Sequence, residues 1–282
     1  TAMIKLMRQE IRRIFKSKSL YITIGIGVFF TLWLLVDQLT ETKETQELIK
    51  KYGTIKMGLY YPDSLYNHFI GLDYWHKQPQ TLYMLFPLLA SIPYASSYCS
   101  EKKSGYLKVM LTRIDRKVYY ISKFISVFFS GFITIISILI ISLIISMMFY
   151  PMLNPEPITS QFPVAIGNSM FKTLFIEHPM CYILLYIIID SIFFGLTSLI
   201  SLAISTITNR IFVATVSSTI VFYIFAFIMS SLKMYTHSPA VYLIPYQPFE
   251  GIKIHVIILH CLVILLLCGA QFIFKEAKKD VL

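Results

Sequence analysis

The sequence predicts an all-α integral membrane protein with six transmembrane helices in a single transmembrane domain, residues 1–282. Hydrophobic residues make up 56% of the chain and charged residues only 14%, whereas soluble domains carry about 25% charged residues. Several apolar segments are longer than the roughly 14 residues of a typical buried helix in a soluble protein. The basic residues lie beside these segments, so the net charge of +10 indicates membrane topology rather than nucleic-acid binding.

The apolar segments define the predicted spans. The second span contains Pro87 and Pro93, and each proline removes a backbone donor, so we expect this span to be broken or bent. The first span is longer than the apolar part of a signal peptide and is expected to be retained. The six spans are residues 20–36, 81–98, 119–148, 181–207, 211–232 and 254–274.

Residues 1–19 are predicted to form an amphipathic helix in the membrane interface. The alternative is an ordinary soluble amphipathic helix. One face of this helix is apolar, with Ile4, Met7, Ile11, Ile14 and Phe15, and the other is basic, with Lys5, Arg8, Arg12, Arg13 and Lys16 directed toward anionic headgroups.

The loops and the orientation follow from the remaining polar residues. Residues 37–80 are predicted to be an extracellular loop, whose first part, with Glu47 and Lys51, could form a short solvated helix. The proline-rich residues 233–253 are predicted to be an extracellular or re-entrant segment. Of the 25 Lys and Arg residues, 17 fall on the side of the N-terminus, which predicts that both termini are cytoplasmic. The many Ile and Lys residues are typical of an AT-rich bacterial genome, so we expect the plasma membrane of a bacterium.

The loop between the second and third spans, residues 99–118, carries the most informative pattern. Ser104 and Gly105 can interrupt the chain direction before a short helix, which would have an apolar stripe that includes Tyr106 and Leu107. Basic residues on the other face would meet headgroups or the acidic surface of a partner.

The pattern Glu-Lys-x-Ser-Gly-Tyr-Leu-Lys…Thr-Arg…Arg…Tyr…Lys within Glu101–Lys123, together with the order of elements, resembles the membrane subunit of ABC transporters of the ABC-2 (type V exporter) class. The resemblance is to permeases for bacterial peptide or antibiotic export and immunity. It implies that residues 99–118 form a coupling helix that docks on an ATPase subunit. A headgroup-binding loop without a partner is the alternative. The resemblance implies these ATPase-coupling residues: Glu101, Lys102, Ser104, Gly105, Tyr106, Leu107 and Arg113.

The resemblance also implies the partners. No glycine is followed by lysine, so the chain has no GxxxxGK[ST] phosphate loop; it is expected to be no enzyme and to bind no cofactor directly. ATP and Mg²⁺ would bind to a separate ABC ATPase subunit, and a second permease copy would complete a homodimer or related heterodimer in contact with membrane lipid. The expected substrate is amphipathic or hydrophobic, such as an antimicrobial or cytolytic peptide or an antibiotic. The alternatives are a non-transporting membrane anchor or sensor and, less favoured, an intramembrane enzyme.

Asp190 is the one acidic residue inside a predicted span. A carboxylate in hydrocarbon is a functional candidate, and Tyr223 and His260 fall at comparable depth, so the three could form a polar cluster. The alternative is that Asp190 only fixes packing. Small residues including Gly195 and Ser198 on the same span predict close packing of helices. The four cysteines show no metal-binding or disulfide pattern, so no metal site is expected.

Overall fold

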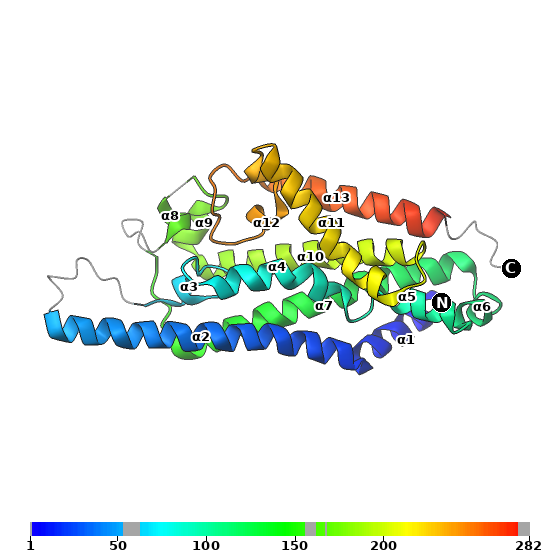
Figure 1. Ribbon diagram of the computed structural model, residues 1–282, viewed down its shortest axis with the longest axis horizontal. Helices are drawn as coiled ribbons and strands as arrows, with labels where there is room; N and C mark the ends of the chain where they lie inside the picture. Colours follow the sequence, from blue (N-terminus) through cyan, green and yellow to red (C-terminus); the bar gives the residue numbers. More distant parts are fainter. Residues whose placement is uncertain (1, 53–62, 156–161, 167, 276–282) are drawn as a thin grey trace.

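The computed structural model describes residues 2–52, 63–155, 162–166 and 168–275. The described residues form an elongated all-helical bundle without strands (Figure 1). The helices are α1 (Ala2–Lys16), α2 (Lys18–Tyr52), α3 (Leu65–His68), α4 (Lys77–Ser91), α5 (Ser97–Lys103), α6 (Tyr106–Leu111), α7 (Arg116–Phe149), α8 (Pro163–Ile166), α9 (Lys172–Glu177), α10 (Pro179–Ser205), α11 (Ile211–Ser231), α12 (Pro239–Tyr242) and α13 (Ile254–Gly269), with a 3₁₀ turn at Tyr235–His237 and a π-helical turn at Ala270–Lys275.

Five of the described helices, α2, α7, α10, α11 and α13, are long and apolar enough to cross a membrane. Each contains most or all of one predicted span, so the chain is a membrane protein, as the sequence predicts. The short helices α1, α5 and α6 lie at one end of the bundle, here called the α6 end, together with the C-terminal end of α13 (Figure 1). Helices α3, α8 and α9 lie at the opposite end, here called the α9 end.

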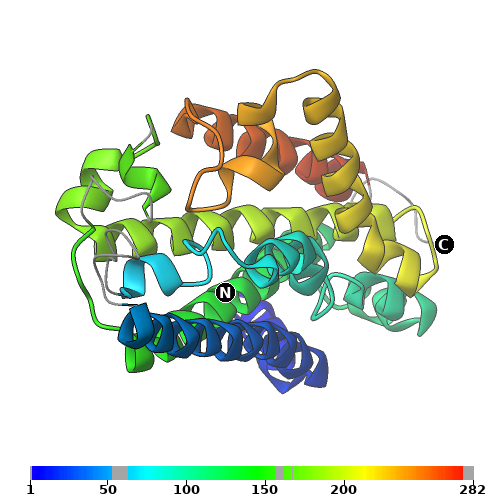
Figure 2. The same cartoon turned by 60° about the vertical axis from the view of Figure 1, so that its left-hand side comes forward.

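Helix α10 is the central helix of the bundle. It runs between α11, α12 and α13 on one side and α2, α4 and α7 on the other (Figure 2). Two glycines allow α7 and α10 to approach closely, because a Cβ atom at Gly195 would lie 3.1 Å from the backbone oxygen of Phe128 and one at Gly131 would lie 3.1 Å from the Cα atom of Gly195. Ser198 donates to the backbone oxygen of Val127 at 3.1 Å. The small residues therefore pack helices together, as expected.

Helix α2 differs from the prediction. The predicted loop was to begin at residue 37, but the helix continues without interruption to Tyr52. The physical reason is that residues 37–52 contain neither Gly nor Pro and carry pairs at helical spacing such as Glu47 and Lys51, which favour a helix even in water. Residues 53–62 of the predicted loop lie outside the described residues.

The second predicted span, residues 81–98, is not one helix. Helix α4 has only 15 residues and ends at Ser91, and a turn at residues 92–96 separates it from α5. The interruption occurs at Pro93, whereas Pro87 remains inside α4. The carbonyl oxygen of Pro87 accepts hydrogen bonds from the hydroxyl groups of Ser91 at 2.8 Å and Ser218 at 3.1 Å.

The segment 233–253 folds back against the bundle. Its short helix α12 presents Tyr242, which is fully buried, and the carbonyl oxygen of Pro245 accepts a hydrogen bond from the hydroxyl group of Tyr182 on α10 at 2.6 Å. The backbone N–H of Tyr246 donates to Gly71 at 3.2 Å. These contacts join the segment to α10 and to the turn after α3. Its position relative to a membrane remains a prediction.

Candidate functional site: a buried ion cluster at the α6 end

Four charged side chains from three helices meet at the α6 end: Glu10 and Arg13 on α1, Glu101 on α5 and Lys123 on α7. We call this group the ion cluster. The Lys123 amino group donates to Glu10 at 3.1 Å and to Glu101 at 2.8 Å. The Arg13 guanidinium lies 3.3 Å from Glu10 and 3.4 Å from Glu101. Each cation therefore contacts both carboxylates, and the formal charges balance.

Three tyrosines complete the ion cluster. Tyr94, in the turn between α4 and α5, donates its hydroxyl hydrogen to Glu10, and Tyr119 on α7 donates to Glu101. The hydroxyl oxygen of Tyr106 on α6 accepts from Arg13 at 2.7 Å. The remaining lone pairs of the carboxylates are thus used by hydroxyl donors, which is what a buried ion pair requires.

Burial makes this arrangement energetically demanding. Lys123 is 1% exposed and Glu10 2% exposed, and removing one partner of a buried pair costs about 3–5 kcal/mol because the other charge is left uncompensated. Arg13 is more exposed, at 43%. Burial lowers the pKa of Arg13, but the hydrogen bond with Tyr106 and the charge of Glu10 outweigh it, so its pKa is raised and the guanidinium stays charged.

The periodicity of α1 places Glu10 in the interior. Leu6, Glu10 and Ile14 follow one another at intervals of four residues, so they share one face, and all three are buried. Arg13, which the sequence predicts to face lipid headgroups, pairs within the ion cluster while 43% of its side chain stays exposed, and the interfacial position of α1 stays a prediction. Apolar Ile4 and Phe15 remain exposed at 66% and 47%. The side chain of Lys5 lies outside the described residues.

The part of the ion cluster on α5 and α7 lies within a region that matches a known family. Residues 61–282 match the family model described as protein of unknown function (DUF2705). The chain belongs to the DUF2705 family. The matched range includes Glu101 and Lys123, whereas the α1 residues precede it. No curated protein and no solved structure matches the chain.

The structure separates the predicted ATPase-coupling residues of this DUF2705 protein into two groups. Glu101 and Tyr106 belong to the ion cluster, Leu107 is 2% exposed in the core, and Gly105 begins α6 with φ +73°, a conformation that favours glycine. The remaining three residues lie on the surface: Lys102, Ser104 and Arg113.

Sequence reasoning missed the roles of Glu10, Tyr94 and Tyr119. A usable signal existed for Glu10, which is the one acid in α1 and shares the periodicity of buried Leu6 and Ile14. Tyr94 carried no such signal, because its partner Glu10 is 84 residues away in sequence, whereas Tyr119 lies within the Glu101–Lys123 pattern, 18 residues from its partner Glu101.

The expected cluster of Asp190, Tyr223 and His260 does not form. Asp190 is fully buried and accepts a hydrogen bond from Tyr83 on α4 at 3.0 Å. Tyr223 instead donates to the backbone oxygen of Met84 at 2.9 Å, and His260 lies 2.9 Å from the hydroxyl group of Tyr242. The cluster does not form because each residue finds a nearer partner on another element, and the single bond of Asp190 to Tyr83 agrees with the alternative that Asp190 fixes packing.

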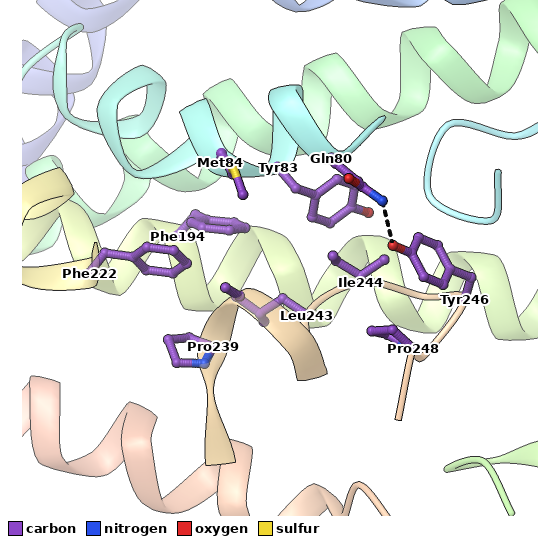
Figure 3. A pocket seen from close by; sticks show the side chains of 11 residues that line it. Gln80, Tyr83, Met84, Phe194, Phe222, Pro239, Leu243, Ile244, Tyr246 and Pro248 are labelled. Carbon is purple, nitrogen blue, oxygen red and sulfur yellow. Dashed lines mark hydrogen bonds between the residues drawn. The ribbon is translucent and has the colours of Figure 1, made fainter. Parts of the chain in front are cut away.

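Tyr83 also lines a cavity of about 180 Å³ between α4, α10, α11 and the segment 239–248 (Figure 3). Gln80 and Tyr246 close one side of this cavity through a 3.3 Å hydrogen bond. Its other walls are apolar, including Phe194 and Leu243. Among the described residues, no group of three His, Cys, Asp or Glu side chains could hold a metal ion.

Proposed function

We propose that this DUF2705 chain is the membrane-spanning permease subunit of an ATP-driven exporter of the ABC-2 class. The substrate would be amphipathic or hydrophobic, such as an antimicrobial or cytolytic peptide or an antibiotic. The proposal assigns the chain to the plasma membrane of a bacterium with both termini cytoplasmic. A second permease copy, identical or related, would complete the transport path.

The ion cluster is the observation that carries the proposal. It joins α1, α5 and the start of α7 through charges of opposite sign, and it joins α6 through the hydrogen bond between Arg13 and Tyr106. Groups joined in this way move together, because separating them leaves a buried charge unpaired. A soluble partner that moves α5 together with the adjoining α6 would therefore also move α1 and α7, which is the property required of a subunit driven from outside the membrane.

The surface of the same end supplies a docking face. Lys102, Lys103, Lys108 and Arg113 are exposed, and Val109 on α6 is 52% exposed. This combination suits an acidic partner surface with an apolar centre. In the proposal, α4, the turn at Pro93 and α5 form the broken second span, which gives six spans in total. ATP and Mg²⁺ bind to the ATPase subunit.

The first test is purification of the tagged chain from its native membrane, followed by mass spectrometry of the proteins that co-elute. We expect a stoichiometric subunit with a GxxxxGK[ST] phosphate loop. If crosslinked and gently solubilised samples both lack an ATPase, the proposal is wrong and a non-transporting anchor or sensor becomes the better interpretation.

A charge-reversal pair tests the docking face. Lys102→Glu with Arg113→Glu should reduce ATPase recovery by tenfold or more, because like charges would then face the acidic partner. Lys43→Glu with Lys50→Glu, two exposed lysines on the distant part of α2, is the matched control and should have no effect. Tyr106 and Leu107 are unsuitable for this test, since their substitution would also disturb the ion cluster and the core.

A further inference from the structure

A second cavity lies at the α9 end, between α2 and the beginning of α4. We propose that this cavity binds the zwitterionic headgroup of a phospholipid, with the ammonium group against Trp33, Trp75 and Asp37 and the phosphate group near Lys77. We call it the headgroup site. This proposal does not depend on the chain being part of an exporter, because the residues of the headgroup site play no part in the ion cluster.

The headgroup site is an open cavity of about 480 Å³. One wall is a single face of α2, where Phe30, Trp33 and Asp37 occur at intervals of three and four residues. The second wall is the turn before α4 and the first part of α4, with Trp75, His76, Lys77, Gln78 and Thr81. Its volume is within the range typical of small-molecule sites.

The cavity straddles the boundary between the apolar and polar parts of α2. Residues 19–36 contain no charged side chain, and Asp37 is the first charged residue after Lys18. Phe30 and Trp33 therefore lie on the apolar side of this boundary and Asp37 on the polar side. In a bilayer, such a boundary falls at the level of the lipid headgroups, where Trp residues are enriched.

Both tryptophans of the chain, Trp33 and Trp75, line this one cavity. They are 48% and 70% exposed, so their rings are accessible to a ligand. Neighbouring rings support them: the Trp33 centroid lies 6.1 Å from that of Phe30, and the Trp75 centroid lies 4.4 Å from that of Tyr74. Indole faces attract substituted ammonium groups through cation–π interaction.

The charges lining the cavity match a zwitterion. Asp37 accepts a hydrogen bond from the neutral amide of Gln78 and, among the described residues, forms no ion pair. Lys77 is exposed and likewise forms no ion pair with any described residue. His76 differs, because it lies 2.8 Å from Asp73 and 3.4 Å from Glu41. After the hydrogen bond with Asp73, the charge of Asp37 also contributes to the raised pKa of His76. No described cation lies within ion-pair distance of Asp37, however, so Asp37 and Lys77 can pair with a ligand that carries both charges.

Tryptophan fluorescence tests the headgroup site directly, because no other tryptophan contributes emission. Protein in dodecyl maltoside micelles would be titrated with dodecylphosphocholine, dodecyl phosphate or dodecyltrimethylammonium. We expect the tryptophan emission to change with dodecylphosphocholine until it saturates. The mole fraction of dodecylphosphocholine at half-saturation should be at least threefold lower than that of either singly charged amphiphile. Equal responses to all three, or no saturation, would overturn the proposal.

Substitutions in the cavity test whether the fluorescence change arises at the headgroup site. Asp37→Asn and Lys77→Gln should each raise the half-saturation mole fraction about threefold or more. Glu44→Gln and Lys43→Gln, exposed on α2 beyond the cavity, should leave it unchanged, with circular dichroism and gel filtration confirming folding. Wild-type affinity in both cavity variants would contradict the site. Soluble glycerophosphocholine should give no saturation, and saturation at the same concentration would replace the lipid with a free solute and overturn the lipid assignment.

Discussion

The two ends of the bundle use different chemistry to hold helices together. At the α6 end, the ion cluster pairs Arg and Lys side chains with two Glu side chains. At the α9 end, the corresponding group is centred on Asp73, which is 2% exposed and accepts hydrogen bonds from Gln38 at 2.6 Å and from the backbone of Trp75 at 3.0 Å. His76 completes it, with its Nδ1 atom 2.8 Å from Asp73.

The difference concerns sensitivity to pH. Burial alone would raise the pKa of Asp73, but hydrogen bonds from His76 and Gln38 outweigh burial and the pKa is lowered. The hydrogen bond with Asp73 raises the pKa of His76, although burial opposes it. The α9 end therefore contains a histidine whose charge state depends on pH near neutrality, whereas the ion cluster at the α6 end contains no histidine.

The largest effect should come from breaking the ion cluster. Lys123→Met should lower the free energy of unfolding by about 3–5 kcal/mol, because two carboxylates would then share only Arg13. Unfolding in mixed micelles measures this change. Lys117→Met, at an exposed lysine in the first turn of the same helix, should cost less than about 1 kcal/mol. Equal losses in the two variants would contradict the structural role of the ion cluster.

Asp73→Ala should have the next largest effect and lower the free energy of unfolding by about 2–3 kcal/mol. The substitution leaves buried donors of Gln38 and the backbone without an acceptor. Glu41→Ala is the control, because Glu41 is 65% exposed and its 3.4 Å contact with His76 should contribute less than about 1 kcal/mol. The same unfolding measurement applies. A loss below that of Glu41→Ala would show that Asp73 does not hold the α9 end together.

A change of pH should alter the free energy of unfolding less than the substitution Asp73→Ala does. The raised pKa of His76 adds stability that is complete below about pH 6.5 and is lost as pH rises through its folded pKa. The lowered pKa of Asp73 adds stability that is complete above about pH 4 and is lost as pH falls through its folded pKa. Thermal unfolding should therefore be most resistant between these limits, and His76→Gln should remove the decline on the alkaline side. An unchanged alkaline decline in that variant would assign it to another group.

The smallest effect is expected in the middle of the bundle. Asp190→Asn should change the free energy of unfolding by less than about 1 kcal/mol, because an amide oxygen can still accept the hydrogen bond from Tyr83. Tyr83→Phe should cost more, since it removes the donor and leaves a buried acceptor unpaired. A loss of 3 kcal/mol or more in Asp190→Asn would instead indicate that Asp190 carries a compensated charge.

Five of the six predicted spans correspond to long apolar helices among the described residues, because a run of apolar residues about 20 long has few alternatives to a membrane helix. The sequence also indicated the interruption near Pro93 and the short helix after Gly105, where local backbone chemistry decides. It indicated that the polar residues after the first span could be helical, but not that they continue α2 without interruption to Tyr52, since polar helix formers are equally compatible with a separate helix in a solvated loop.

The polar contacts of the bundle could be predicted much less well. Tyr83 and Asp190 are separated by 107 residues, and Lys123 and Glu10 by 113. No local pattern joins such pairs, because only the packing of complete helices brings them together. Glu101 and Tyr106 were identified through a motif, but their partner Arg13 was assigned to lipid because its helix was considered alone.

The uninterrupted course of α2 has a mechanical consequence. Its 35 residues extend about 52 Å at 1.5 Å per residue, and only Ser17 separates it from α1. A rigid rod of this length acts as a lever arm. A rotation of about 5° around Ser17 would carry the far end through roughly 5 Å and Trp33 through roughly 2 Å. A small displacement of α1 would thus be magnified along the rod before it reaches the headgroup site.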